Sequence, residues 1–138
     1  MKARIKLMEN VCFVGESGSG HAIVMDGAPE GGGRNLGMRP METVLIGTGG
    51  CTAYDVVVIL KKSGQDVRGC DVSVRAERAA TDPKVFTKIH MHFVVRGRAL
   101  KRNLVEQAIR LSHEKYCSAS AMLGKTAEMT RDFELVEA

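Results

Sequence analysis

Four cysteines are the side chains of this 138-residue sequence best suited to covalent chemistry: Cys12, Cys51, Cys70 and Cys117. They lie far apart and form no CxxC pair, so their spacing predicts neither a secreted disulfide framework nor a closed zinc site. Cys51 lies in the glycine-flanked segment GTGGCTAYDVV, and Cys117 opens SASAMLG, where the first backbone N–H groups of a short helix favour a thiolate. Cys12 and Cys70 lie among apolar neighbours and are interpreted as core residues. Cys51 and Cys117 are the candidates for thiol chemistry, and the alternative is that both are small core residues.

Three ionisable residues lie at spacings that bear on these two thiols. Asp55 follows Cys51 by four residues, but its charge would raise a thiol pKa, so it is interpreted as a solvated or helix-paired acid. Glu42 precedes Cys51 by nine residues, about 13 Å along a helix, so only a second subunit could bring it to that thiol. His113 precedes Cys117 by four residues and could act as its base, which leaves a cysteine hydrolase open as a further alternative.

Metal and nucleotide motifs are weak in this sequence. His90 and His92 lie two residues apart on one face of an expected strand and are candidate metal ligands, although such pairs are more often without function. The GTGGC segment lacks the preceding strand and the complete GxGxxG spacing of a nucleotide-binding loop. We therefore expect neither a resident metal nor a cofactor.

Composition indicates a soluble globular protein. The sequence is 44% hydrophobic and 26% charged, which excludes wholesale disorder. Its net charge of +4 comes from Lys and Arg scattered among Asp and Glu, which does not favour a nucleic-acid partner. The N-terminus has no apolar run typical of a signal peptide, and no segment reaches the roughly 18 unbroken apolar residues of a membrane span. We expect a cytoplasmic protein.

The segment 40–63 is predicted to be the central helix that positions Cys51. Its apolar residues fall on every side of a helical projection, which indicates a buried helix. Pro40 suits the first helical position, and Ser63 with the following glycine supplies a stop. The three glycines just before Cys51 should each cost about 1 kcal/mol relative to alanine, so close packing must compensate.

The rest of the chain is expected to complete one α+β domain over residues 1–138. Strands that pair antiparallel, with helices inserted between them, predict a sheet with one face on two helices. The loop before the central helix is glycine-rich; it is interpreted as an exposed, mobile linker, with a lid carrying Arg34 or Arg39 as the functional alternative. The expected elements are a three-stranded meander in 1–25, the glycine-rich loop 26–39, a hairpin of strands 67–77 and 85–95, an amphipathic helix 100–116, a short helix from Cys117 and a last strand 127–137.

Taken together, these motifs resemble the OsmC/Ohr family, named for osmotically inducible protein C and organic hydroperoxide resistance protein. The resemblance covers nearly the whole chain and is greatest to the YhfA-like branch. It rests on the entry Pro40-Met41-Glu42, on Cys51 in GGCTAYDVV, on Cys117 in HEKYCSASAML, and on the order of strands and helices.

This resemblance implies an α+β fold of antiparallel sheets, a long buried central helix and a second helix, assembled as an intertwined homodimer. It implies that Cys51 is oxidised by an organic hydroperoxide to a sulfenic acid, that Cys117 condenses with it to a disulfide, and that a dithiol reductant, lipoyl-linked in the better known members, reduces the pair again. The family activates its thiol with an arginine oriented by a glutamate; Arg34, Arg39 and Glu42 are the candidates here, although the glutamate position itself corresponds to Met41. That departure keeps open a non-catalytic protein that binds a small molecule on the same fold.

Overall fold

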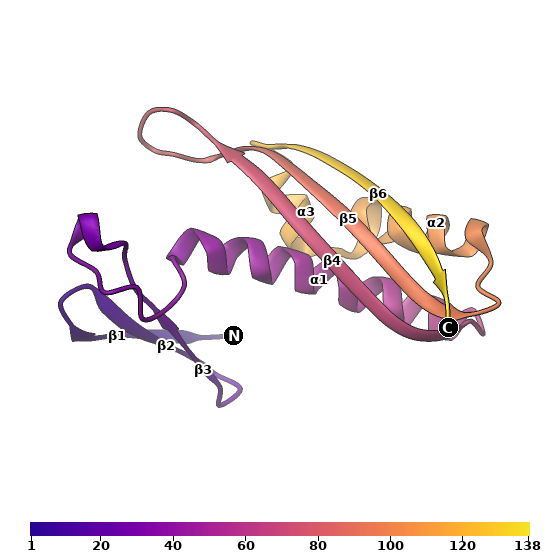
Figure 1. The fold of residues 1–138 in the computed structure, drawn as a ribbon, viewed down its shortest axis with the longest axis horizontal. Coiled ribbons are helices and arrows are strands. Elements are labelled where there is room, and N and C mark those ends of the chain that lie inside the picture. The colour runs from indigo at the N-terminus through magenta and orange to yellow at the C-terminus, as the bar shows by residue number, and fades with distance from the viewer. The chain divides into compact units, whose positions relative to one another are not determined.

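The computed structural model describes all 138 residues, which form two compact units, Met1–Leu45 and Ile46–Ala138. The first unit contains the expected three-stranded meander (Figure 1). Its strands pair antiparallel in the order β1 (Ala3–Glu9), β2 (Cys12–Ser17) and β3 (Ala22–Met25). The first turn places Asn10 at φ 53° and the second places Gly20 at φ 91°, in the left-handed region that Asn and Gly adopt most readily.

A buried aspartate organises the glycine-rich loop. The Asp26 carboxylate, whose residue is 2% exposed, accepts backbone N–H groups from Gly27 at 2.7 Å, Leu36 at 3.1 Å and Arg34 at 3.2 Å. Burial acts to raise the pKa of Asp26, but these three N–H groups outweigh it and hold the pKa below its ordinary value. The segment expected to be a mobile linker is therefore a hydrogen-bonded turn around Asp26, with a short 3₁₀-helix, η1, at Pro29–Gly31.

The central helix α1 runs from Pro40 to Lys62, within one residue of the expected bounds. The Glu42 carboxylate accepts the backbone N–H of Arg39 at 2.7 Å, which is the backward half of a capping box. At the other end, Gly64 lies at φ 76° just beyond the helix, in the left-handed conformation that commonly terminates helices. Pro40 and the Ser63-Gly64 pair therefore predicted both ends of the helix to within one residue.

The second unit is built on a three-stranded sheet with mixed pairing. The predicted hairpin is confirmed as β4 (Asp66–Arg78) paired antiparallel with β5 (Phe86–Arg98). The last strand, β6 (Glu128–Glu137), pairs with β5 in parallel, where an antiparallel strand was expected. The helices between β5 and β6 cross over the sheet, and such a crossover returns the chain parallel to its starting strand. The chain thus has two three-stranded sheets rather than one.

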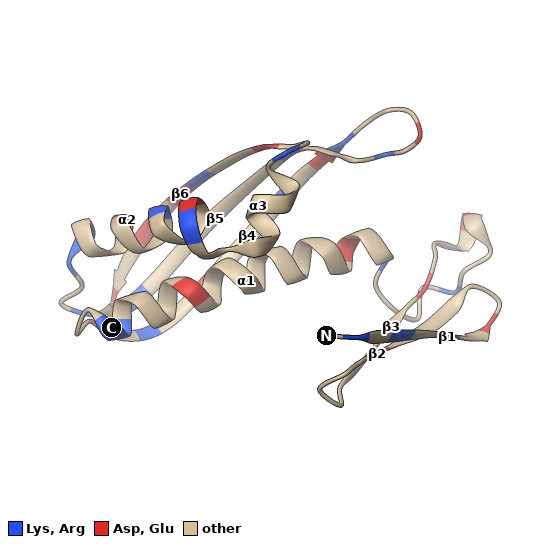
Figure 2. Cartoon of the chain, turned by 180° about the vertical axis from the view of Figure 1, so that it is seen from behind, with Lys and Arg blue, Asp and Glu red and all other residues tan.

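Helices cover one face of the second sheet (Figures 1 and 2). They are α1 from Ile46 onward, α2 (Arg102–Leu111), the π-helical turn η2 (Ser112–Tyr116) and α3 (Ser118–Leu123). Strand β5 alternates buried and more exposed residues, because a strand turns successive side chains to opposite faces. The core of this unit consists of Val56, Leu60, Phe86, Ile89, Met91, Phe93, Val95, Val105, Ala108, Ile109, Cys117 and Ala127.

Only one face of α1 is buried within the chain, which corrects the expectation of a helix buried all round. Its buried residues recur at helical spacing, whereas Ile46 and Tyr54 are 60% and 72% exposed. Among its glycines, only Gly49 is closely packed: a Cβ there would lie 3.0 Å from the Val74 side chain, while one at Gly50 would meet no atom within 4 Å. The exposed face of α1 is therefore apolar, and it carries no side chain at Gly47 and Gly50.

Charge is sparse along α1. Its charged residues are Glu42, Asp55 and the terminal pair Lys61 and Lys62, and Figure 2 shows the long uncharged stretches between them. The helix is consequently long and apolar enough to cross a membrane by length and composition. That is weak evidence for a span, because core helices of soluble proteins meet the same criterion.

Candidate functional site

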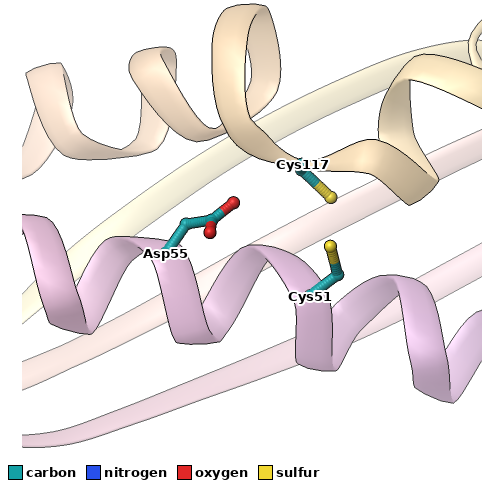
Figure 3. A group of neighbouring side chains, drawn as sticks. All are labelled: Cys51, Asp55 and Cys117. Atoms are coloured by element: carbon teal, nitrogen blue, oxygen red, sulfur yellow. The ribbon is translucent and has the colours of Figure 1, made fainter. Parts of the chain in front are cut away.

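Cys51, Asp55 and Cys117 converge in the second unit, and we refer to them as the thiol cluster (Figure 3). One ligand-type atom from each, the two Sγ atoms and a carboxylate oxygen, lies within 4.8 Å of the other two. Cys51 and Asp55 project from consecutive turns of α1, and Cys117 lies where α3 begins. The structure therefore brings together the two predicted cysteines, which are far apart in sequence. It also places Asp55 beside them, although the sequence analysis interpreted Asp55 as a solvated or helix-paired acid.

Cys117 is held by its own short helix. It is the N-cap of α3, and its Sγ accepts the backbone N–H of Ser120 at 3.4 Å and the Ser120 hydroxyl at 3.1 Å. The residue is 2% exposed. This burial raises the pKa of the Cys117 thiol and outweighs the bonds from Ser120, which lower it; the neighbouring Cys51 raises it further. Sequence reasoning expected the helix N-terminus to favour a thiolate at Cys117, but burial is the larger effect.

Asp55 ends a chain of hydroxyl groups. Ser112 Oγ donates to Asp55 Oδ2 at 3.0 Å and lies 2.8 Å from Thr52 Oγ1. A serine hydroxyl has one proton, so Ser112 must accept from Thr52 while it donates to Asp55. Thr52 and Ser112 are 3% and 0% exposed. These two hydrogen bonds, which we call the hydroxyl relay, hold the Asp55 carboxylate beside the two sulfurs. The sequence analysis missed the relay because Ser112 and Asp55 are 57 residues apart.

A π-helical turn delivers both Ser112 and Cys117 to the cluster. The Cys117 N–H bonds to the Ser112 carbonyl at 2.7 Å, five residues back, where an α-helix would use the carbonyl four residues back. The helix expected to continue to Tyr116 is therefore α-helical only to Leu111. Turns of this kind occur frequently at functional sites.

The hydrolase alternative gains no support from this geometry. The Cys117 sulfur accepts its hydrogen bonds from the backbone N–H and the hydroxyl of Ser120, and none comes from His113. Burial is the main cause that lowers the pKa of His113, Arg131 lowers it further, and Glu114 opposes both. His113 therefore lacks the contact that a general base for Cys117 requires.

The three residues proposed as thiol activators belong to the first unit, and each has a local partner there. Glu42 caps α1 through Arg39, as described above. The Arg39 guanidinium donates to Asn35 Oδ1 at 2.9 Å and to the Gly37 carbonyl at 3.3 Å. Arg34 forms an ion pair with Glu9 at 2.9 Å, with 47% of its side chain exposed. Exposed pairs of this kind contribute little to stability, so Arg34 is not fixed by that partner.

The two candidate metal-binding histidines share a carboxylate on the outer face of the second sheet. His90 Nε2 and His92 Nδ1 lie 3.1 and 2.8 Å from Asp132 Oδ1 on the adjacent strand. The expectation that both histidines share one face is correct. The His92 hydrogen bond is the main cause that lowers the pKa of Asp132, against a smaller opposing effect of desolvation.

The remaining cysteines are free thiols that do not belong to the thiol cluster. Cys12 is 8% exposed, as expected for a core residue, whereas Cys70 is only half-buried on β4. Burial and the adjacent Asp71 raise the pKa of Cys70. Neither residue has a thiol partner, which makes both useful internal controls for oxidation.

Comparison with known proteins places the chain in a family. The family model described as OsmC-like protein matches residues 31–131. Protein YhfA of Escherichia coli (strain K12) is 48% identical over 141 aligned residues, which cover all of both chains. A hypothetical protein from Aquifex aeolicus VF5 has a solved structure with a TM-score of 0.87 and 28% identity, covering 99% of this chain and 96% of that one.

A more distant structure shares the fold. An organic hydroperoxide resistance protein OsmC from Legionella pneumophila superposes with a TM-score of 0.70 at 16% identity, covering 96% of this chain and 95% of that one. The order of strands and helices, the family match and the full-length similarity to YhfA agree with one another. This chain belongs to the OsmC-like family.

Proposed function

We propose that this protein is a cysteine-based thiol peroxidase that reduces organic hydroperoxides. The observation that carries the proposal is the approach of the Cys51 and Cys117 sulfurs to within 4.8 Å. Two thiols this close can form a disulfide after small side-chain movements. The hydroperoxide as substrate is suggested by the name of the Legionella pneumophila relative, which shares the fold.

Unequal burial assigns the two cysteines different roles. Cys51 is half-buried, whereas Cys117 is 2% exposed. The Cys51 thiolate attacks the O–O bond of the hydroperoxide, so that Cys51 becomes a sulfenic acid and the alcohol leaves. The Cys117 thiol then attacks the sulfenic sulfur, forms the disulfide and releases water. An external dithiol of the lipoyl type restores both thiols and becomes a disulfide itself.

We further propose that two chains assemble as an intertwined homodimer. The first unit leaves apolar residues uncovered: Ile5, Leu7 and Ile23 are 58%, 54% and 45% exposed. A cleft of about 700 Å³ in this unit is lined by Ile5, Val11, Phe13, Met25 and Val44, among others. Together with the exposed apolar face of α1, these residues offer surface that a second copy of the chain would cover.

A homodimer also supplies a route for activation of Cys51. Arg34, Arg39 and Glu42 are proposed to act on the thiol cluster of the partner chain, where a guanidinium would favour the Cys51 thiolate. Arg34 is the more available of the two arginines, because its partner Glu9 is exposed and only one of its guanidinium nitrogens is bonded to it. We propose a cytoplasmic location, in which the cysteines are kept reduced between turnovers.

A non-catalytic binding protein is the alternative. One observation favours it: Asp55 places a negative charge beside the thiols, which disfavours the thiolate that a peroxidase needs. In that case the cluster would bind a small thiol-reactive or apolar molecule without turnover.

Mass spectrometry of the reduced protein after one equivalent of cumene hydroperoxide separates these functions. The peroxidase loses two hydrogens, mapped to a disulfide between Cys51 and Cys117, and does so faster than with hydrogen peroxide. The Cys117→Ser variant should instead accumulate a sulfenic acid at Cys51 that dimedone traps. A variant with Cys12 and Cys70 both changed to Ser serves as the control and should behave as the wild type. Oxidation of Cys51 no faster than that of Cys70 would exclude the peroxidase.

A further inference from the structure

We propose that the reduced thiol cluster is also a binding site for a thiophilic divalent cation, with Zn²⁺ as the representative ion. The ligands are the sulfurs of Cys51 and Cys117 and a carboxylate oxygen of Asp55. This site goes beyond the proposed peroxidase and does not depend on it, because it requires only the reduced side chains.

The ligand types and their separation suit zinc. Thiolate sulfur and carboxylate oxygen are both common zinc ligands, and zinc in proteins is usually tetrahedral. Zn–S bonds of about 2.3 Å in a tetrahedral site place two sulfurs about 3.8 Å apart. The three ligand atoms already lie within 4.8 Å of one another, so side-chain movements of about 1 Å would bring them to the separations of a tetrahedral zinc site. The fourth position is left for water or another small ligand.

Charge gives a second reason. Metal binding requires both thiols to lose their protons, so two thiolates and a carboxylate then place three negative charges in a partly buried space. The hydrogen bonds made to Asp55 and Cys117 come from serine hydroxyls and a backbone N–H, and none comes from Lys or Arg. A divalent cation neutralises most of this charge where no cationic side chain of the second unit bonds to it.

The surrounding hydrogen bonds are those of a supported metal site. Ligating carboxylates are usually hydrogen-bonded themselves, and Ser112 bonds to Asp55 through Oδ2, which leaves Oδ1 free to face the cation. Ser120 bonds to the Cys117 sulfur from both its backbone and its hydroxyl. Formation of a disulfide requires only the two cysteines and gives no reason for the buried hydroxyls that hold Asp55. A metal site does give one, because a carboxylate ligand must be held in position.

Metal and hydroperoxide would compete for the same sulfurs. Binding replaces two thiol protons with one cation. Oxidation of the bound form by one hydroperoxide takes up two protons, converts the thiolates to a disulfide, yields alcohol and water, and frees the cation. A bound cation should therefore slow oxidation of Cys51, and disulfide formation should release the cation.

The test is Zn²⁺ binding to the full-length protein, reduced with a phosphine and titrated against a chromophoric chelator. The wild type is expected to take up a single equivalent of Zn²⁺ that hydroperoxide releases. Asp55→Asn should weaken binding at least tenfold, and Cys51→Ser or Cys117→Ser should weaken it further. Cd²⁺ in place of Zn²⁺ should give the ultraviolet sulfur-to-metal absorption of two thiolates, which reports the ligands directly.

Two controls locate the site. A variant with Cys12 and Cys70 both changed to Ser, and another with His90 and His92 both changed to Ala, should bind Zn²⁺ as the wild type does. Unchanged affinity in Asp55→Asn, no binding by the wild type, or loss of binding in the histidine variant would overturn the proposal. Circular dichroism confirms that each variant is folded. Binding without hydroperoxide turnover would sustain the metal site and refute the peroxidase, so the two proposals fail separately.

Discussion

Replacing Ser112 by alanine tests whether the hydroxyl relay holds Asp55 in place. The substitution removes a hydrogen bond to a carboxylate at 3.0 Å and the acceptor that Thr52 uses at 2.8 Å. A hydrogen bond to a charged group is worth about 1.5–3 kcal/mol. Thr52 can turn its hydroxyl to the helix carbonyl four residues earlier, so the loss of Ser112 as its acceptor should cost little stability. We expect Ser112→Ala to lower the free energy of unfolding by about 2 kcal/mol.

The partner substitution Thr52→Val should cost less. It removes one donor to Ser112 but leaves the Ser112 bond to Asp55 intact, because Ser112 supplies that proton. The net value of a neutral hydrogen bond is about 1 kcal/mol, or half of the Ser112→Ala effect. The order of the two effects follows directly from the direction of the relay.

Urea denaturation at fixed protein concentration measures both effects. With a slope of about 2 kcal/mol per molar urea for a chain of this size, Ser112→Ala should lower the midpoint by about 1 M. Ser63→Ala is the matched control, since its exposed hydroxyl bonds only to the Ile59 carbonyl, and it should stay within about 0.5 kcal/mol of the wild type. A Thr52→Val effect equal to or larger than that of Ser112→Ala would refute the relay.

Three further predictions concern assembly, the cap of α3 and the glycine-rich loop. Ile46→Asp should shift the proposed homodimer toward monomer in sedimentation velocity, whereas Glu106→Lys on the exposed side of α2 should not; equal sedimentation of both variants would count against the proposed dimer. Cys117→Ala should be about 1 kcal/mol less stable than Cys117→Ser in thermal or urea unfolding, since serine retains the N-cap acceptor, and a reversed order would contradict the cap. The pKa of Asp26 is lower in the folded state, so its ionised form stabilises the fold above pH 3.8, and this contribution is lost as the pH falls through the folded-state value. Asp26→Asn should therefore be less stable than the wild type at pH 7 and approach it in acid; a difference independent of pH would refute that linkage.

Residues with local effects made much of the fold predictable from sequence. Pro40 and the Ser63 stop fixed α1 to within one residue, and alternation identified β4 and β5. The predicted direction of β6 was wrong, because the apolar pattern of a strand is the same in parallel and in antiparallel pairing. The π turn at Ser112–Tyr116 was missed for a similar reason: an apolar stripe reports helical periodicity but not which carbonyl each N–H reaches.

The candidate site was predictable in part. Both cysteines of the thiol cluster were identified, because thiols near helix starts and glycines are uncommon enough to notice. Asp55 was set aside, since within its own helix it could only repel a thiolate. Its role depends on Ser112, which reaches it through tertiary contact alone. Glu42 has a local explanation available from sequence, because a glutamate at the third helical position is the mark of a capping box.

The π turn before Cys117 also makes the pairing of the two thiols depend on the number of residues in the chain. Such a turn is equivalent to an α-helix that has gained one residue. Deleting one residue between Ser112 and Cys117 would restore α-helical pitch and rotate Cys117 by about 100° relative to α2, while β5 and its core partners stayed unchanged. A single-codon deletion therefore separates the paired thiols from the scaffold that carries them.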